Sequence, residues 1–158
     1  KLNGDATLLQ LNQAPPPGTW FAGWTTVPPA KGSIVTGIHH PKADLKKISF
    51  ATYRDKQICT PTGGSTFSCY SSSSGFFVRT NYYDGTTEEG SSGSGLFNTS
   101  GQVVGILKGG DGTCYDSNAH GIYTEFVLPY VIGSWDKWLY TMSLGMPWLN
   151  LLLSNKNN

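Results

Sequence analysis

The sequence predicts an all-β domain, a single β-barrel or sandwich, closed by one helix near its C-terminal end. Three observations lead to this fold class. The 158 residues, 38% of them hydrophobic, are enough for one domain with a sizeable core. The 20 glycines and 9 prolines, together with many Ser and Thr residues, indicate frequent turns. Short apolar runs lie between these turn signals, whereas helical periodicity occurs only once.

The expected elements follow from these runs in chain order. The apolar stretch 5–11 opens the chain as a strand, and the proline-rich connector 13–18 after it cannot join a sheet ladder. The helix is expected at 134–140, with Ser134 as its N-cap and Trp135, Trp138 and Leu139 on one face. Further strands are expected at 20–24, 33–38, 48–53, 76–82 and 122–126, a polar loop at 71–74, and a hairpin from 96–97 and 103–107 around a turn at 98–101.

The charge distribution argues against several classes of partner. The net charge is +1, and charged residues make up 13% of the chain, about half the usual share of ~25%. We therefore expect neither a nucleic-acid nor a membrane partner, and interpret Lys42, Lys46 and Lys47 as a solvated loop. Residues 1–10 lack the features of a signal peptide, and the apolar tail 146–153 is too short to cross a bilayer. The histidines have no Cys or carboxylate at ligand spacing, so no metal or other cofactor is expected.

The Gly- and Ser-rich segment 88–97 is the strongest candidate for chemistry. Gly90 and Gly93 flank Ser91 and Ser92, and an apolar hairpin follows directly. A serine nucleophile needs an exposed, tight turn with backbone N–H groups directed at the developing oxyanion, and glycines permit such a turn. A flexible surface turn would have the same composition, so this segment alone does not decide the function.

The flanking segments make the pattern more specific. The motif at 90–94, the hairpin ending at 105–110, Cys114, residues 121–123 and a final helix occur in an order that resembles the second barrel of the trypsin/chymotrypsin family. Within that family the chain is similar to bacterial lysyl endopeptidases over their C-terminal half. The shared segments are 5–9, 21–24, 38–41 and 90–94.

The resemblance implies a Greek-key β-barrel, the second barrel of a double-barrel fold, followed by a C-terminal helix. It also implies a division of the chain into an inter-barrel segment at 1–18, the barrel with its helix at 19–142 and a tail at 143–158.

The resemblance further implies a serine endopeptidase that cleaves polypeptides through an acyl-enzyme. Ser92 is then the nucleophile and Asp5 the acid that orients the histidine. The N–H groups of Gly90 and Ser92 would form the oxyanion hole. Ser91 stands where trypsin-like enzymes have an aspartate that pairs with a newly cut N-terminus, so that activation switch should be absent.

The general base is expected to lie outside this chain. In chymotrypsin-like chains the triad order is His, Asp, Ser, which places the histidine upstream of Asp5. The subtilisin order of Asp, His, Ser could be met by Asp5, His39 or His40, and Ser92, but it requires an α/β layout that the single helix does not support. His39 and His40 are instead interpreted as a loop pair making local hydrogen bonds.

The three cysteines agree with a missing N-terminal half. Cys59 and Cys69 bracket a turn at Gly63 and Gly64, so a local disulfide is expected. Cys114 is left over, and the resemblance implies a bridge to the missing half. Disulfides form in oxidising compartments, so we expect a secreted or extracellular protein, with the periplasm as an alternative.

The substrate pocket implied by the resemblance involves Thr86, Lys108, Gly109, Gly110, Asn118 and His120. Thr86 and Asn118 stand where trypsin and lysyl endopeptidase, respectively, have an aspartate. Lysine specificity is therefore in doubt, although Asp111 or Asp116 could compensate. Lys108 could favour acidic substrates or simply face solvent.

Two other function classes compete with an endopeptidase. A catalytically inactive relative could serve as a binding module, but Ser92, Asp5 and Gly90 are all retained. The 13% of aromatic residues could indicate a carbohydrate-binding surface. Aromatic residues such as Trp20, Phe76 and Tyr123 lie in strand patterns, so packing in the core is the preferred interpretation.

Overall fold

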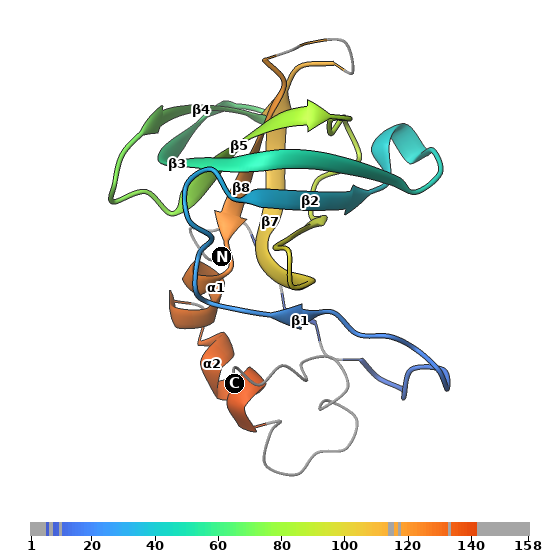
Figure 1. Ribbon diagram of the computed structural model, residues 1–158. Helices are drawn as coiled ribbons and strands as arrows, with labels where there is room; N and C mark the ends of the chain where they lie inside the picture. Colours follow the sequence, from blue (N-terminus) through green and yellow to red (C-terminus); the bar gives the residue numbers. More distant parts are fainter. Residues whose placement is uncertain are drawn as a thin grey trace.

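The computed structural model describes residues 6, 8–9, 11–113, 116, 118–132 and 134–141, and in this part the chain is mostly β (Figure 1). The elements are β1 Gly23–Trp24, β2 Ile34–His39, η1 Pro41–Ala43, β3 Lys47–Gly63, β4 Thr66–Ser71, β5 Phe77–Asp84, β6 Gly95–Phe97, β7 Gln102–Asp111, β8 His120–Glu125, α1 Val127–Ile132 and α2 Trp135–Thr141. No helix among these residues has the length and apolar character needed to cross a membrane.

The strands form a closed ring. Six of them are hydrogen-bonded in the order β7-β6-β2-β3-β5-β8, and β8 pairs back to β7. These pairings are antiparallel. Strand β4 pairs with β3 outside the ring, and β1 runs parallel to β7. The β6–β7 pair is the predicted hairpin.

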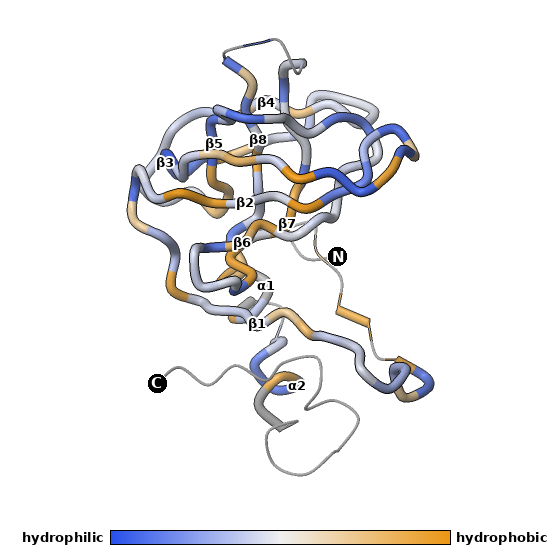
Figure 2. Tube along the Cα trace, turned by 45° about the vertical axis from the view of Figure 1, so that its right-hand side comes forward, coloured by the Kyte–Doolittle hydropathy of each residue, from blue (hydrophilic) through white to orange (hydrophobic). Residues whose placement is uncertain are grey.

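Alternation along the strands separates an inner from an outer face. On β2, Val35 and His39 are buried, whereas Ile34 and Ile38 are exposed. The buried hydrophobic residues inside the ring include Ala51, Val78, Leu96, Leu107 and Tyr123. Figure 2 shows hydrophobic stretches along β2 and around β6 and β7. The period of two therefore decides which β2 residues reach the interior.

A second, smaller core holds the helices to one end of the ring (Figure 1). The Trp24 ring lies 5.4 Å from Phe126 and 5.1 Å from Tyr130, and Phe126 lies 5.8 Å from Trp135. Leu139 completes this cluster. The predicted helix is thus present as α2, directly after Ser134; Trp135 and Leu139 of its predicted apolar face are buried, and the side chain of Trp138 lies outside the described part of the chain.

Several predicted boundaries were wrong. The strand expected at 20–24 is only β1, and 48–53 is the first part of the much longer β3. Strand β4 and helix α1 were not predicted. Of the aromatic residues expected in the core, Tyr123 is fully buried, but Trp20 is 96% and Phe76 51% exposed. Of the strand expected at 5–11, the described residues 6, 8–9 and 11 lie outside strands.

Candidate active site

The Gly/Ser segment forms a tight loop between β5 and β6. The Ser91 N–H donates to the Glu88 carbonyl at 3.0 Å, and the Ser94 N–H donates to the Ser91 carbonyl at 3.2 Å. Gly90 and Gly93 have φ angles of 86° and 85°, a region that side chains with a Cβ rarely adopt. The glycines that flank the two serines in the sequence are thus required by the turn.

Two backbone hydrogen bonds fasten this loop to β7. The Gly93 N–H donates to the Leu107 carbonyl, and the Leu107 N–H donates to the Ser94 carbonyl, both at 2.8 Å. Ser92 is exposed, and its hydroxyl donates to the Lys108 carbonyl at 3.3 Å. The predicted nucleophile therefore lies at the surface beside β7.

The backbone amides of the loop alternate in their bonding. The N–H groups of Ser91 and Gly93 are hydrogen-bonded, whereas those of Gly90 and Ser92 make no hydrogen bond within the described part of the chain. Two unbonded N–H donors on either side of one residue, next to an exposed serine, are the groups that an oxyanion hole requires.

The connection between β2 and β3 contacts the other side of the loop. The Lys42 N–H donates to the Glu89 carbonyl at 2.7 Å, and the Lys42 ammonium lies 2.8 Å from the Glu88 carboxylate. A Cβ on Gly90 would lie 3.3 Å from the His40 carbonyl oxygen, so glycine is favoured there by space as well as by φ. Lys42 and Ala43 themselves have φ angles of 49° and 57°, which are uncommon for residues with side chains.

The adjacent histidines have different surroundings. His40 is exposed, and its Nδ1 lies 3.2 Å from the Asp44 carbonyl, the local contact that was expected. His39 instead points into the ring and is 3% exposed. Its Nδ1 lies 2.9 Å from the Ser91 hydroxyl. The interpretation of His39 as a locally bonded loop residue was wrong, because the alternation of β2 turns it inward; it contacts Ser91 rather than Ser92.

The residues predicted for the substrate pocket do not all line one cavity. Gly110 and His120 line a cavity of about 380 Å³ between the β3–β4 hairpin and the ends of β7 and β8. Lys108 and Gly109 instead meet the hairpin. The Lys108 ammonium lies 5.0 Å from the Phe67 ring centre, and a Cβ on Gly109 would lie 3.0 Å from that ring.

Thr86 and Asn118 do not line this cavity. Thr86 is buried, and its hydroxyl donates to the Thr87 carbonyl at 3.5 Å. The Asn118 N–H donates to the Asp116 carboxylate at 2.8 Å. Asp111, one of the two acids considered for lysine recognition, does lie in the cavity wall.

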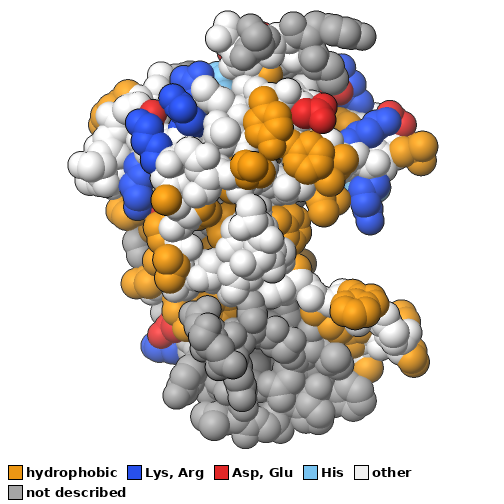
Figure 3. Space-filling model, in the orientation of Figure 1, with side chains coloured by type: hydrophobic (Ala, Val, Ile, Leu, Met, Phe, Trp, Pro, Cys, Tyr) orange, Lys and Arg blue, Asp and Glu red, His pale blue; other side chains and the backbone are white. Residues whose placement is uncertain are grey.

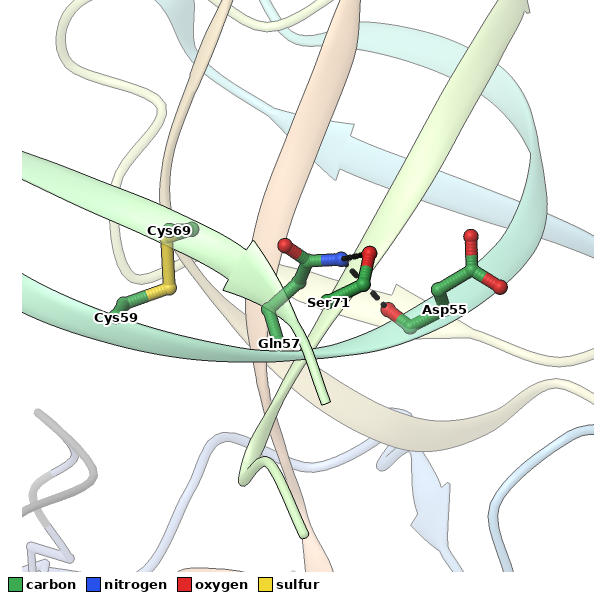
Figure 4. Close-up of a disulfide and its surroundings, with 5 residues drawn as sticks. All are labelled: Asp55, Gln57, Cys59, Cys69 and Ser71. Atoms are coloured by element: carbon green, nitrogen blue, oxygen red, sulfur yellow. Dashed lines mark hydrogen bonds between the residues drawn. A yellow bond between two sulfur atoms is a disulfide. The ribbon is translucent and has the colours of Figure 1, made fainter. Parts of the chain in front are cut away.

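Sequence reasoning missed the contribution of the β3–β4 hairpin to this cavity, whose wall includes Gln57, Phe67 and Cys69 from the hairpin and Arg79 from β5. The predicted Cys59–Cys69 disulfide is present and joins directly opposed residues of β3 and β4 (Figure 4). The Gln57 side chain donates to the Ser71 hydroxyl at 3.0 Å beside it (Figure 4). The alternation of residues 66–71 could have indicated β4. The catalytic acid predicted at Asp5 and Cys114, predicted to bridge to a missing half, lie outside the described residues.

Comparisons with known proteins identify the family of this chain. The family described as lysyl endopeptidase, C-terminal domain, matches residues 1–124. A lysyl endopeptidase of Pseudomonas aeruginosa is 33% identical over 134 residues, which cover 77% of this chain. The chain spans 27% of the length of that curated relative.

Solved structures share the fold at lower sequence identity. The active form of the Rv3671c protease of M. tuberculosis has a TM-score of 0.53 and 19% identity, covering 73% of this chain and 46% of that one. An inactive form of the same protease has a TM-score of 0.52 and 20% identity, covering 78% and 55%. With the family match over most of its length, this chain belongs to the lysyl endopeptidase C-terminal domain family.

Proposed function

We propose that this domain supplies the nucleophile and the oxyanion hole of a trypsin-like serine endopeptidase. The observation that carries the proposal is the loop around Ser92: it combines an exposed hydroxyl, hydrogen-bonded to the Lys108 carbonyl on β7, with the unbonded amides of Gly90 and of Ser92 itself. The ring of strands is, in this proposal, the second Greek-key β-barrel of a double-barrel protease.

The reaction uses these groups in two steps. The Ser92 hydroxyl attacks a peptide carbonyl while a histidine takes its proton, and the amides of Gly90 and Ser92 stabilise the oxyanion. The histidine then returns the proton to the leaving amine, which leaves an acyl-enzyme on Ser92. Water, activated by the same histidine, releases the acyl group. Asp5 would orient that histidine.

The histidine is proposed to come from an N-terminal domain, of the same or a separate chain. His39 is already bonded to Ser91, His40 bonds to Asp44, and His120 lies in the cavity wall. The chain spans 27% of its curated relative, which leaves ample sequence for such a domain. Cys114 is proposed to bridge to it, and together with the Cys59–Cys69 disulfide it favours a secreted, extracellular or periplasmic protein.

The proposed substrate is a polypeptide, bound along β7 next to Ser92. The named relative is a lysyl endopeptidase. A preference for lysine in this chain would require an acid near the site, and Asp111 in the cavity wall is the described residue proposed for that role. Asp111→Asn should then lower kcat/KM for lysyl substrates and leave that for neutral residues unchanged.

Labelling with a fluorophosphonate probe tests the proposal. Ser92 should be labelled in the full-length gene product, and the 158-residue chain alone should react far more slowly, since loss of the base in subtilisin costs about 10⁶-fold in turnover. Ser92→Ala should abolish labelling, whereas Ser94→Ala, two residues away, should leave it in place. A full-length product that folds but is not labelled would instead indicate an inactive, protease-like binding module.

A further inference from the structure

His39 and Ser91 form a buried polar pair beneath the loop. They are 3% and 1% exposed, and they come from segments 52 residues apart. Besides its 2.9 Å contact with His39 Nδ1, the Ser91 hydroxyl oxygen accepts the Glu88 N–H at 3.2 Å. Ser91 is thus held both to β2 and to the start of its own loop.

The contacts favour a neutral His39 ring hydrogen-bonded to Ser91. The Ser91 hydroxyl has one proton and two acceptor sites, so beside the Glu88 N–H it can donate to an unprotonated Nδ1 of His39 or accept from a protonated one. Burial lowers the pKa of His39, the neighbouring His40 lowers it further, and Glu88, which is paired with Lys42, partly opposes them. His39 Nε2 is buried and has no hydrogen-bond partner in the described part of the chain, which also disfavours the charged ring.

Backbone hydrogen bonds hold the loop on both sides of the serines, but the amides of Gly90 and Ser92 are not among the bonded groups, so their orientation depends on how Ser91 is held. Gly90 and Gly93 lie on either side of the serines, and glycine has the widest choice of φ. The Ser91 side chain cannot leave the interior unless the peptide planes before and after it rotate. The plane after Ser91 carries the N–H group of Ser92, and the plane before Ser91 begins at Gly90 and so adjoins the Gly90 N–H group. Holding Ser91 therefore holds both donors.

We propose that His39 is the positioning residue of the oxyanion hole: through its hydrogen bond to Ser91, it fixes the amides of Gly90 and Ser92. The inference rests on the proposed function of these amides. Both partners belong to this chain, so the anchor forms when the domain folds and needs no group released by proteolysis.

Substitutions of His39 in the full-length gene product test this role. His39→Asn places an amide oxygen near the position of Nδ1 and keeps an acceptor for Ser91, whereas His39→Leu fills the space without one. We expect His39→Leu and Ser91→Ala each to lower kcat and the rate of fluorophosphonate labelling by about 10- to 100-fold, with little change in KM, since removal of one oxyanion donor costs about 10²–10³-fold. His39→Asn should recover most of the rate.

Two controls separate positioning from a merely structural role. His40→Asn changes the exposed neighbour and should leave kcat unchanged. The double variant of His39→Leu and Ser91→Ala should be no slower than Ser91→Ala alone, because Ser91→Ala already breaks the His39–Ser91 hydrogen bond, together with the one from the Glu88 N–H. If the loss of kcat in His39→Leu disappears when the rates are corrected for the fraction of folded protein, the inference is overturned.

A structural readout tests the inference independently of activity. Amide hydrogen exchange over 88–94 should accelerate in His39→Leu and return toward the wild-type rate in His39→Asn. Exchange in β5 and β8 should stay unchanged in both variants. An inactive wild-type protein would refute the proposed function and remove the catalytic part of the inference. Unchanged exchange over 88–94, in an active or inactive protein, would refute the anchor itself.

Discussion

At the scale of single residues, Glu125 is a carboxylate inside a largely apolar ring. It is 2% exposed, accepts a hydrogen bond from the Tyr53 hydroxyl, and lies 2.8 Å from the Lys56 ammonium. Burying a carboxylate is costly unless partners satisfy its oxygens, and here one oxygen has the phenol and the other the ammonium. The contacts of Glu125 with Tyr53 and Lys56 therefore hold β3 to the end of β8.

Removing one partner should reveal this dependence. Lys56→Met leaves the buried carboxylate without its countercharge and should lower the free energy of unfolding by about 1–3 kcal/mol, as measured by urea denaturation. Lys31→Met is the matched control, because its ion pair with Asp55 is exposed and should contribute less than about 1 kcal/mol. Equal losses in the two variants would contradict the assignment.

The residues of the candidate site were predicted to different extents. The Ser92 loop could be found from its motif, because a tight turn between glycines is encoded locally. The contact of His39 with Ser91 joins segments far apart in the chain, and no local pattern specifies it. The spacing of Val35 and His39 on β2 could have placed His39 on the inner face, since residues four apart on a strand point the same way.

At the scale of elements, hydrophobicity predicted the strands of the ring but not the pieces around it. Strand β4 is rich in Ser and Thr, and it forms because it pairs with the second half of β3. Helix α1 consists of apolar, partly β-branched residues that favour a strand locally. The segment is nevertheless helical, because Phe126 and Tyr130 pack around Trp24 there. Packing against the rest of the protein thus outweighs the local preference for a strand.

The disulfide in the β3–β4 hairpin should matter for the cavity. Phe67, near the hairpin tip, contacts Gly109 and the Lys108 ammonium, so a loosened hairpin would release one wall. Replacing Cys59 and Cys69 together by Ser should lower the free energy of unfolding by about 1–3 kcal/mol and accelerate amide exchange in β4. Unchanged exchange in β4 would show that strand pairing alone holds the hairpin.

At the scale of the whole molecule, the closed ring buries one face of strands such as β2 and leaves the other outside, whereas β8 is buried almost throughout. Exposed apolar side chains include Ile34, Ile38, Ile48 and Tyr83. Figure 3, in the orientation of Figure 1, shows hydrophobic side chains at the surface among polar ones. Three tyrosines are buried in the core, Tyr53, Tyr82 and Tyr123. The Tyr53 hydroxyl is hydrogen-bonded to Glu125, and the Tyr82 hydroxyl to Thr87 and to the Tyr123 hydroxyl. The aromatic rings of these tyrosines thus belong to the apolar core, and their hydroxyl groups are polar atoms buried within it.

These tyrosines should make the fold sensitive to alkali. Burial raises the pKa of each, Glu125 raises that of Tyr53 further, and the Tyr82–Tyr123 pair at 2.9 Å raises that of Tyr123. An unfolded tyrosine has a pKa of about 10, so the unfolded state loses these protons first. Stability is then fully present below about pH 10 and declines as the pH rises toward the folded-state pKa values. Urea midpoints should fall steeply above about pH 10, and Tyr123→Phe should make that decline shallower even where it lowers stability at neutral pH. Parallel curves for the two proteins between pH 8 and 12 would mean that Tyr123 ionises without unfolding, and hence that the interior of the ring admits water.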